Sequence, residues 1–224
     1  RECNMGKAVV LVSGGMDSCV TAACAIESGY TLAFLHMNYG QRTENRELKA
    51  FNDIAKFYNV KEKLVVDITH LSKIGNSCLT DHQLDVPKAN LETNNIPNSY
   101  VPFRNANILS AAVSWAETNY SNAIFIGAVE EDSSGYPDCR KSFFKAFENA
   151  IKHGSKPKTQ IKIRTPLISL SKKEIIEKGI SLNAPIQLSW SCYKNEDMPC
   201  NECDSCFLRA RGFKLANRID PIIK

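Results

Sequence analysis

The most specific chemical pattern in the sequence is a group of four cysteines near its end. Cys192, Cys200, Cys203 and Cys206 fall within fifteen residues, and two overlapping Cys-x2-Cys units place three of the thiols on tight turns. Four thiolates at such spacing suit a tetrahedral zinc ion, which then keeps no open position for water. The pattern therefore predicts one structural zinc ion per chain. An iron-sulfur cluster is the alternative metal group, because it also takes four thiolates.

A second pattern is a loop of small residues near the start of the chain. Residues 9–12 form an apolar run, and residues 13–18, Ser-Gly-Gly-Met-Asp-Ser, interrupt it. Both glycines can take a positive φ at little steric cost, so that successive backbone N–H groups converge on an anion. Asp17 or Ser18 is expected to cap the following helix, whose N-terminus favours phosphate.

This loop lacks the Lys-Ser/Thr ending of a Walker A motif and the full Gly-x-Gly-x-x-Gly pattern of dinucleotide-binding folds. On pattern alone, a tight turn without a ligand is as well supported as a nucleotide site.

Polar turns follow other apolar runs. Residues 38–42 and 130–140 are two such turns, and Arg104 opens a helical segment after Pro102. Ligands of open α/β sheets bind beyond the carboxyl ends of the strands, so we expect these turns to converge with the first loop. Arg140 can bind a carboxylate as a bidentate fork. Taken singly, each acid or base in these turns is more often a solvated loop residue, as for Asp132.

An alternation of strands and helices would position these motifs. Apolar runs predict strands at 9–12, 30–37, 63–68, 123–129 and 161–164. Spacings of three and four predict helices after the first loop and at 44–58, 104–120 and 142–153. The first of these helices is expected to bury Val20, Ala23, Cys24 and Ile26. The alternation predicts an α/β fold, a Rossmann-like, doubly wound parallel sheet of about five strands.

Two further segments complete the expected organisation. Ser171 and Glu174 resemble a capping box for a short helix through residue 178 that Gly179 ends. Residues 69–102 lack any periodic rhythm and predict a long loop, which would serve as a lid or a dimer contact. We expect an α/β domain at 5–180 and a small C-terminal, zinc-binding helical region at 181–224 packed on it.

The composition of the chain excludes several classes of protein. The chain has 224 residues, and its 28 basic and 24 acidic residues leave a net charge of +4, which is too slight to argue for direct binding of nucleic acid. No stretch approaches the ~18 apolar residues of a membrane span, and no signal peptide precedes Met5, which we interpret as the natural start. Nine cysteines without a secretory signal argue against a disulfide framework. We expect a cytoplasmic protein with no membrane contact.

Taken together, these motifs resemble those of the 7-cyano-7-deazaguanine synthases, ligases of queuosine precursor synthesis in the ATP pyrophosphatase superfamily. The matching pieces run in order over nearly the whole chain: residues 13–18, Tyr39-Gly40-Gln41-Arg42, Val101-Pro102-Phe103-Arg104-Asn105, Ser134-Gly135-Tyr136-Pro137-Asp138-Cys139-Arg140, and Cys192-Tyr193 through Cys206-x2-Arg209. The first motif is shared with GMP synthetases and tRNA thiolases, whereas the turn ending at Arg140 and the cysteine group are far more specific. Phe103 departs from the family, which has a small residue there, often Gly.

The resemblance implies an adenine nucleotide alpha hydrolase-like fold and a reaction. The substrates would be 7-carboxy-7-deazaguanine, ammonia and Mg-ATP, and the enzyme would be a homodimer. ATP would adenylate the carboxylate, ammonia would give an amide, and a second activation would remove the amide oxygen to leave the nitrile.

The resemblance also implies roles for particular residues. ATP would contact the first loop and the helix after it, at Val12, Ser13, Gly14, Gly15, Met16, Asp17, Ser18, Cys19, Val20, Thr21 and Ala22. The backbone N–H groups of this loop would hold the departing pyrophosphate, and Asp17 would orient Mg²⁺. The residues with catalytic roles would be Asp17, Ser18, Arg104 and Arg140, and the substrate would contact Tyr136, Asp138, Arg140 and Arg104.

Within this set, Arg104 and Arg140 would neutralise phosphate or the substrate carboxylate. Asp138 would accept hydrogen bonds from the amino-pyrimidine edge of the base. Cys139 is expected to pack or to line the pocket, because the reaction needs no covalent nucleophile.

Two other functions remain open at this stage. One is an ATP-dependent tRNA-modifying thiolase or lysidine-type ligase with the same loop, which would need a basic surface and a catalytic cysteine pair. The other is a zinc-ribbon binding module whose α/β part only binds a nucleotide.

Overall fold

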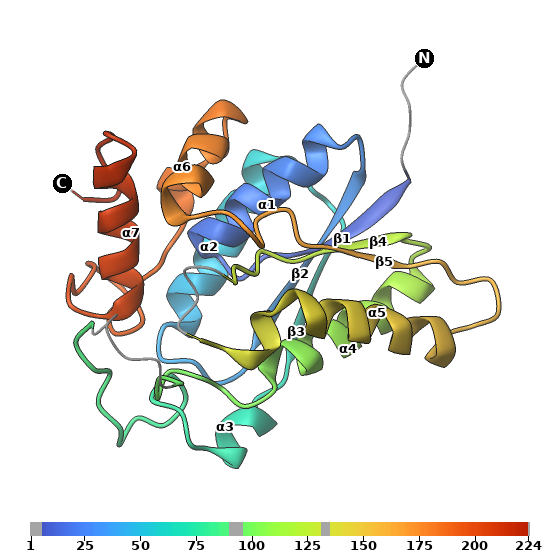
Figure 1. Ribbon diagram of the computed structural model, residues 1–224, viewed down its shortest axis with the longest axis horizontal. Coiled ribbons are helices and arrows are strands. Elements are labelled where there is room, and N and C mark those ends of the chain that lie inside the picture. Colours follow the sequence, from blue (N-terminus) through green and yellow to red (C-terminus); the bar gives the residue numbers. More distant parts are fainter. Residues whose placement is uncertain (1–5, 90–95, 131–134, 224) are drawn as a thin grey trace.

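The computed structural model describes residues 6–89, 96–130 and 135–223 and contains one five-stranded parallel sheet. Its strands are β1 (Lys7–Leu11), β2 (Thr31–Asn38), β3 (Lys63–Asp67), β4 (Ala123–Phe125) and β5 (Lys162–Arg164). Their order is β3-β2-β1-β4-β5, so the chain turns back to the other side of β1 between β3 and β4 (Figure 1). The predicted doubly wound α/β fold is confirmed.

Helices cover both faces of this sheet (Figure 1). Helices α1 (Met16–Glu27) and α2 (Glu44–Phe57) pack on the face that contains Val10 and Phe34. Helices α4 (Arg104–Thr118) and α5 (Lys141–Gly154) pack on the face that contains Val9 and Leu35. Neighbouring residues of β1 are therefore buried on opposite faces, which explains why its sequence is apolar without alternation.

Helix α6 (Lys172–Ser181) begins with the predicted capping box. The Ser171 hydroxyl accepts a hydrogen bond from the Glu174 N–H, and the Glu174 carboxylate accepts one from the Ser171 N–H at 2.8 Å. The prediction that Gly179 ends this helix is wrong, because the helix continues to Ser181. A Cβ at Gly179 would lie 2.7 Å from a methyl group of Val20, so this glycine permits close packing of α6 on α1.

The C-terminal region packs beside α6. It contains a short 3-10 turn at Ile186–Leu188 and helix α7 (Asp204–Leu215). Gly212 of α7 lies against Lys172 and Ile176, where a Cβ would come within 2.9 Å of either side chain. The two helices therefore lie side by side at one end of the sheet (Figure 1).

Three further expectations differ from the structure. Residues 69–102 include a short helix, α3 (His70–Ile74), before an irregular segment, of which 90–95 lie outside the described residues. The predicted strand at 123–129 ends at Phe125, and residues 126–129 continue as loop. Ile26 is 42% exposed, because it faces away from the core that buries Val20 and Cys24.

The irregular segment is tied to the rest of the molecule. The Arg42 guanidinium donates to the backbone carbonyls of Cys78 and Asp81 at 2.7 Å each, and also to that of Leu84. The Ala89 N–H donates to the Glu202 carbonyl at 2.8 Å. The segment thus reaches from the end of β2 to the cysteine-rich region.

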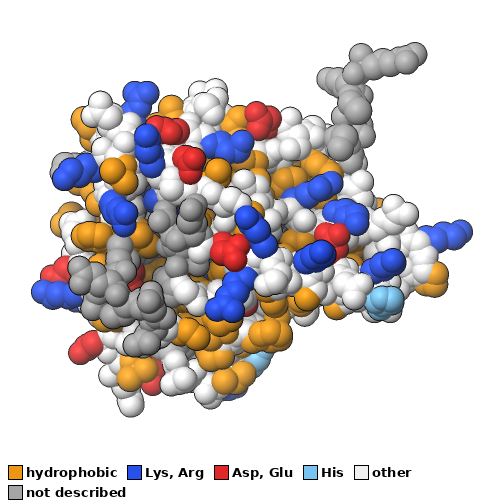
Figure 2. Space-filling model, viewed as in Figure 1, with side chains coloured by type: hydrophobic (Ala, Val, Ile, Leu, Met, Phe, Trp, Pro, Cys, Tyr) orange, Lys and Arg blue, Asp and Glu red, His pale blue; other side chains and the backbone are white. Residues whose placement is uncertain are grey.

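The surface carries charges of both signs. On the face drawn in Figure 2, Lys and Arg side chains lie among Asp and Glu side chains and do not gather in one stripe. No helix within the described ranges is long and apolar enough to cross a membrane.

Candidate active site and metal centre

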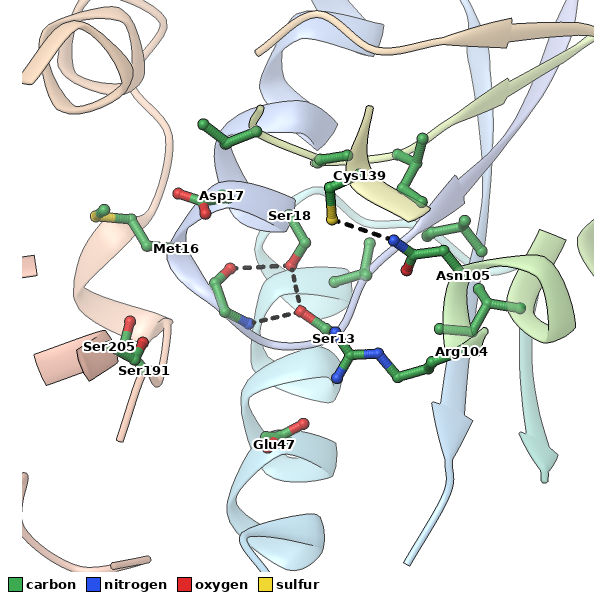
Figure 3. Close-up of a pocket in the computed structure, with 18 of the residues that line it drawn as sticks. Ser13, Met16, Asp17, Ser18, Glu47, Arg104, Asn105, Cys139, Ser191 and Ser205 are labelled. Atoms are coloured by element: carbon green, nitrogen blue, oxygen red, sulfur yellow. Dashed lines mark hydrogen bonds between the residues drawn. The ribbon is translucent and has the colours of Figure 1, made fainter. Parts of the chain in front are cut away.

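A cavity of about 290 Å³ lies at the carboxyl ends of β1, β2 and β4. This is the point where the strand order reverses, between β1 and β4, and open α/β sheets bind ligands at such a point. Its wall includes the first loop, the N-termini of α1 and α4, Glu47 of α2, and Trp190, Ser191 and Tyr193 (Figure 3). The predicted convergence of the first loop with the turns after β2 and β4 is thus present, through Tyr39 and Tyr136.

The first loop uses its two glycines differently. Gly14 has φ +90°, whereas Gly15 has φ −75°, so the expectation that both glycines take positive φ is wrong for Gly15. A Cβ at Gly14 would lie 2.5 Å from the Glu47 carbonyl oxygen. Gly14 therefore permits both the turn and the close approach of α2.

Helix α1 begins directly after this loop, at Met16, with Gly15 as its N-cap. The prediction that Asp17 or Ser18 caps the helix is wrong, because both residues already lie in its first turn. The Ser18 hydroxyl instead donates to the Gly15 carbonyl at 2.9 Å, and the Ser13 hydroxyl accepts the Gly15 N–H at 3.2 Å. These bonds hold the loop in one shape at the helix N-terminus, where an anion is favoured.

Only part of the predicted nucleotide-binding set lines the cavity. Val12, Ser13, Gly15, Met16, Asp17 and Ser18 line it. Gly14 and the buried residues Cys19, Val20, Thr21 and Ala22 lie behind that wall, in the loop and in α1.

Lys172 is a site residue that the sequence analysis missed. Its ammonium group contacts both carboxylate oxygens of Asp17, at 2.8 and 3.0 Å, and its side chain lines the cavity. It is the first residue of α6, so the capping box of that helix was the available signal. A cation thus lies beside a phosphate-type loop that has no Walker lysine.

Arg104 reaches the cavity from the first turn of α4. Its guanidinium donates to the Tyr39 hydroxyl at 3.1 Å and lies 5.2 Å from the centre of the Tyr39 ring. Within the described residues it makes no ion pair with a carboxylate, so it can receive an anion. The preceding Phe103 has φ 56°, a conformation that glycine adopts more easily. This explains why a small residue suits that position.

The predicted site residues in the turn before α5 do not all line the cavity. Tyr136 lines the cavity, and its hydroxyl lies 2.8 Å from the Ser99 hydroxyl. The Asp138 carboxylate accepts the Asn105 N–H at 2.9 Å, so the anion at the N-terminus of α4 is part of the protein itself. Arg140 is exposed and, like Asp138, is not part of the cavity wall. Asp132 and Ser134 lie outside the described residues.

Cys139 packs against the cavity, as expected. Its sulfur accepts a hydrogen bond from the Asn105 side-chain amide at 3.3 Å. Burial raises the pKa of this thiol to about 11, so it is protonated and a weak nucleophile near neutral pH.

Glu47 is a second residue that the sequence analysis missed. Its carboxylate accepts hydrogen bonds from the Thr43 hydroxyl at 2.7 Å and the Gln41 amide at 3.2 Å, and it faces the cavity below the first loop (Figure 3). Desolvation raises the pKa of Glu47 to about 7, although both hydrogen bonds and the Arg104 charge act in the opposite direction. The sequence shows only one acid among several on an amphipathic helix.

The four clustered cysteines form one site that could hold a metal ion. The sulfurs of Cys192, Cys200, Cys203 and Cys206 all lie within 4.8 Å of one another. The Cys192 sulfur accepts the N–H groups of Lys194, Asn195 and Cys200 at 3.3 to 3.4 Å. These N–H groups would stabilise a negative charge on the Cys192 sulfur, which is the form that binds a metal ion.

Comparison with known proteins identifies the family. The model of the family described as "Queuosine biosynthesis protein QueC" matches residues 7–217. The chain belongs to the QueC family.

Two curated relatives cover 96% of the chain. A 7-cyano-7-deazaguanine synthase of Chloroherpeton thalassium is 59% identical over 216 residues and is itself covered over 96% of its length. The protein of the same name from Chlorobium chlorochromatii is 57% identical and is covered over 95%. These high identities confirm the resemblance drawn from the motifs.

Solved structures show the fold alone. A 4-thiouridine synthetase in complex with RNA and bound ATP has a TM-score of 0.54 at 16% identity, over 95% of this chain and 53% of that chain. The U34-tRNA thiolase NcsA of Methanococcus maripaludis, with its [4Fe-4S] cluster, has a TM-score of 0.52 at 17% identity, over 96% and 73% of the two chains. The chain therefore shares its fold with these two enzymes.

In this QueC family member the cysteine-rich region also contacts the elements that form the cavity wall. The Trp190 N–H donates to the Gly14 carbonyl at 2.8 Å. The Glu196 carboxylate accepts the N–H groups of Asn45 and Arg46, at 3.1 and 3.3 Å, and so caps the N-terminus of α2. The Arg46 guanidinium lies 4.5 Å from the centre of the Trp190 ring. The cysteine-rich region therefore positions both the first loop and the helix that carries Glu47.

Proposed function

We propose that this protein is an ATP-dependent 7-cyano-7-deazaguanine synthase that acts in the cytoplasm. It would convert 7-carboxy-7-deazaguanine and ammonia to the nitrile through an adenylated acid, an amide and a second adenylate. The observation that carries this proposal is that the phosphate-type loop and the unpaired Arg104 guanidinium face one cavity at the switch point of the sheet. Such a site can hold the phosphates of ATP and a carboxylate side by side.

The loop suits adenylation better than transfer of the terminal phosphoryl group. It has no lysine of its own, and Lys172 supplies a cation beside Asp17 from the other side of the cavity. We propose that Lys172 and the loop N–H groups stabilise the charge that builds on the departing pyrophosphate. Ser18 would hold the loop in one conformation through its hydrogen bond to the Gly15 carbonyl.

Asp17 fits the role of a magnesium ligand. Its carboxylate lines the cavity at the start of α1, and oxygen ligands of this kind suit Mg²⁺. The ion, when bound with ATP, would neutralise phosphate charge. The protein itself would orient Asp17 through Lys172.

Arg104 would bind the substrate carboxylate or the phosphate of the adenylate. Tyr136 would contact the base from the cavity wall. Arg140 and Asp138 remain proposed substrate residues from the sequence motif, although Asp138 also holds the start of α4.

The cysteine site fits zinc. The Cys200 and Cys206 sulfurs lie 3.9 Å apart. Tetrahedral Zn–S bonds of about 2.3 Å place two sulfurs about 3.8 Å apart. A four-iron cluster binds each thiolate through a separate iron, which holds the sulfurs further from one another. We propose one structural zinc ion per chain.

The alternative of a tRNA thiolase is less well supported. Such an enzyme needs a catalytic cysteine pair, and Cys139 is the single cysteine of the cavity wall in the part of the chain that the structure describes. The homodimer expected from the resemblance stays a prediction, which light scattering would test.

One incubation tests the proposed function. The protein is mixed with ATP, ammonia and 7-carboxy-7-deazaguanine, and mass spectrometry follows the nitrile, AMP and pyrophosphate. Formation of nitrile with two AMP for each product would support the proposal. AMP formation without nitrile, or turnover only with tRNA, would contradict it.

A further inference from the structure

The proposed reaction releases protons from nitrogen, and the described part of the cavity wall offers a carboxylate that can accept them. When ammonia attacks the adenylated acid, a C–N bond forms, the C–O bond to AMP breaks, and the nitrogen must lose a proton to leave the neutral amide. In the second half, the nitrogen loses two protons. One leaves as the amide oxygen attacks ATP and the neutral O-adenylated imidate forms with release of pyrophosphate, and the other leaves as the C–O bond to AMP breaks and the nitrile forms. Each step therefore needs a base beside the same nitrogen.

We propose that Glu47 is this base in both half-reactions, an inference that rests on the proposed function. Its carboxylate is one of two in the cavity wall among the described residues, the other being Asp17. Asp17 is held by Lys172 through both oxygens. The Glu47 carboxylate makes no ion pair there and is bound only by neutral donors, Thr43 and Gln41.

The other titratable groups of the cavity are poorly suited to accept a proton. Burial raises the pKa of the Cys139 thiol to about 11. Desolvation also raises the pKa values of the Tyr39 and Tyr193 hydroxyls. These groups stay protonated near neutral pH, and Arg104 and Lys172 are cations in their usual state. Among the carboxylates of the described cavity wall, Glu47 is the one that is not already bound to a cation.

Polar and charged groups approach Glu47 from several elements. Glu44 belongs to its own helix, Thr43 is the N-cap of that helix, and Gln41 lies in the turn before it. Tyr39 directly follows β2, and Arg104 belongs to α4. The side-chain oxygen Oε1 of Gln41 in turn accepts the Tyr39 N–H at 2.9 Å, which fixes the side-chain amide that donates to Glu47. The cation of Arg104 lies near enough to act on Glu47 electrostatically without a direct ion pair. A base in such a site can take up a proton and release it again near pH 7.

The position of Glu47 places it between the two parts of the reaction. Its helix touches the first loop, because the Glu47 carbonyl oxygen approaches Gly14, and Arg104 faces it across the cavity (Figure 3). The loop would hold the phosphates of ATP, and Arg104 would hold the acid that is activated. The nitrogen would enter between these two groups, on the side where Glu47 lies.

The test separates adenylation from proton removal. Glu47→Gln keeps the size of the side chain and removes its basicity, and Glu44→Gln on the same helix is the matched control. We expect Glu47→Gln to slow nitrile formation at least about 100-fold. Exchange of labelled pyrophosphate into ATP, measured with the acid and without ammonia, should stay within about threefold of the original protein, because that step removes no N–H proton. Glu44→Gln should match the original protein in both assays.

The pH profile is best measured with the amide as substrate, because the amide, unlike ammonium, does not itself titrate in this range. The rate of nitrile formation from the amide and ATP should rise as the pH passes about 7, where Glu47 becomes a carboxylate, and then level off. Glu47→Gln should give a low rate without this rise. Glu47→Asp, which restores a carboxylate, should recover part of the rate.

Melting temperatures separate a role of Glu47 in proton transfer from a purely structural role. The folded pKa of Glu47 lies above its ordinary value of 4.5, so the folded state binds the extra proton and loses stability as pH rises through about 7. Glu47→Gln should therefore melt at or above the temperature of the original protein at pH 8. A lower melting temperature with parallel loss of pyrophosphate exchange would overturn the proposal, as would an unchanged rate from the amide.

Failure of the proposed function would give a third pattern of assay results. In that case the original protein and Glu44→Gln would also make no nitrile. If Glu47→Gln does not fold, Glu47→Asp carries the test through the pH profile of the amide reaction. A profile identical to that of the control in height and shape would then overturn the proposal.

Discussion

Gly14 shows how one missing side chain serves two requirements. Its φ of +90° disfavours any residue with a Cβ, and its position leaves no room for one beside the Glu47 carbonyl oxygen. The neighbouring Gly15 has an ordinary φ, and a Cβ there would lie 3.3 Å from the Ser13 hydroxyl, a side-chain atom, rather than against backbone. At the residue scale, the loop therefore depends on one of its two glycines.

Gly14→Ala should destabilise the fold by about 2 to 3 kcal/mol, from backbone strain and from displacement of α2. It should also reduce nitrile formation, since the loop and Glu47 would move apart. Urea unfolding measures the first effect and product formation the second. Gly154→Ala is the control, because nothing lies within 4 Å of a Cβ there and its φ is not positive. Equal stability of the two variants would contradict this explanation.

Arg104 and Arg140 differ in their surroundings, and variants should show this. Arg104 is enclosed by the cavity wall, whereas Arg140 is exposed. We expect Arg104→Ala to reduce kcat/KM about 100-fold or more, since a charge-assisted contact inside a cavity is lost. Arg140→Ala should raise the KM of the base substrate by a smaller factor and leave the KM of ATP unchanged. Equal effects on both substrates would place Arg140 on the phosphates instead.

At the scale of elements, a buried ion pair joins α7 to the end of the chain. Arg209 donates to both oxygens of Asp220, at 2.6 and 2.9 Å, and to the Ser189 hydroxyl at 2.9 Å. Both charged side chains are 4% exposed. The pair thus fixes α7 against the segment that leads into the cysteine site.

Arg209→Met should cost about 3 to 5 kcal/mol of folding stability, because it leaves the Asp220 charge buried and unpaired. The double variant with Asp220→Leu should cost less than the single one. Lys49→Met, which removes an exposed pair with Asp53, should change stability by less than about 0.5 kcal/mol. Chemical denaturation compares the stability of all three variants. A double variant that is less stable than Arg209→Met would contradict this account of the buried pair.

At the scale of the whole molecule, the cysteine site joins parts that are far apart in sequence. Residues of this region bind the first loop through Trp190, cap α2 through Glu196 and contact the irregular segment through Glu202. A bound metal ion would therefore stabilise one side of the cavity wall in addition to the C-terminal region.

Removal of the metal should lower stability and activity together. A chelator, or Cys200→Ser, is expected to release one zinc ion per chain and to lower Tm by about 10 °C or more. Nitrile formation should fall in parallel, since Gly14 and α2 lose their supports. Calorimetry and metal analysis follow the change, with Cys24→Ala as a control outside the cluster. A metal-free variant that stays folded and fully active would contradict a structural role for the metal.

Much of this architecture could be predicted from the sequence. Apolar runs and helical spacing located the five strands and the main helices, because local periodicity reports which faces are buried. The cysteine spacing located the metal-type site, because tight turns bring thiols together without help from distant parts. Boundaries were less accurate where packing overrides local signals, as at Gly179.

The contacts between cavity residues that are far apart in sequence follow only from the tertiary structure. Lys172 meets Asp17 across 155 positions of the sequence, and the Glu47 backbone meets Gly14 because α2 packs on β2, the strand beside β1. Asp138 occupies the N-terminus of α4, a position that favours an anion. Sequence spacing fixes local conformation, whereas the charge and pKa of a cavity residue depend on which distant groups packing brings within a few ångströms. The sequence by itself therefore determined the loop, the strands and the cysteine cluster, and packing decided which side chains share the cavity.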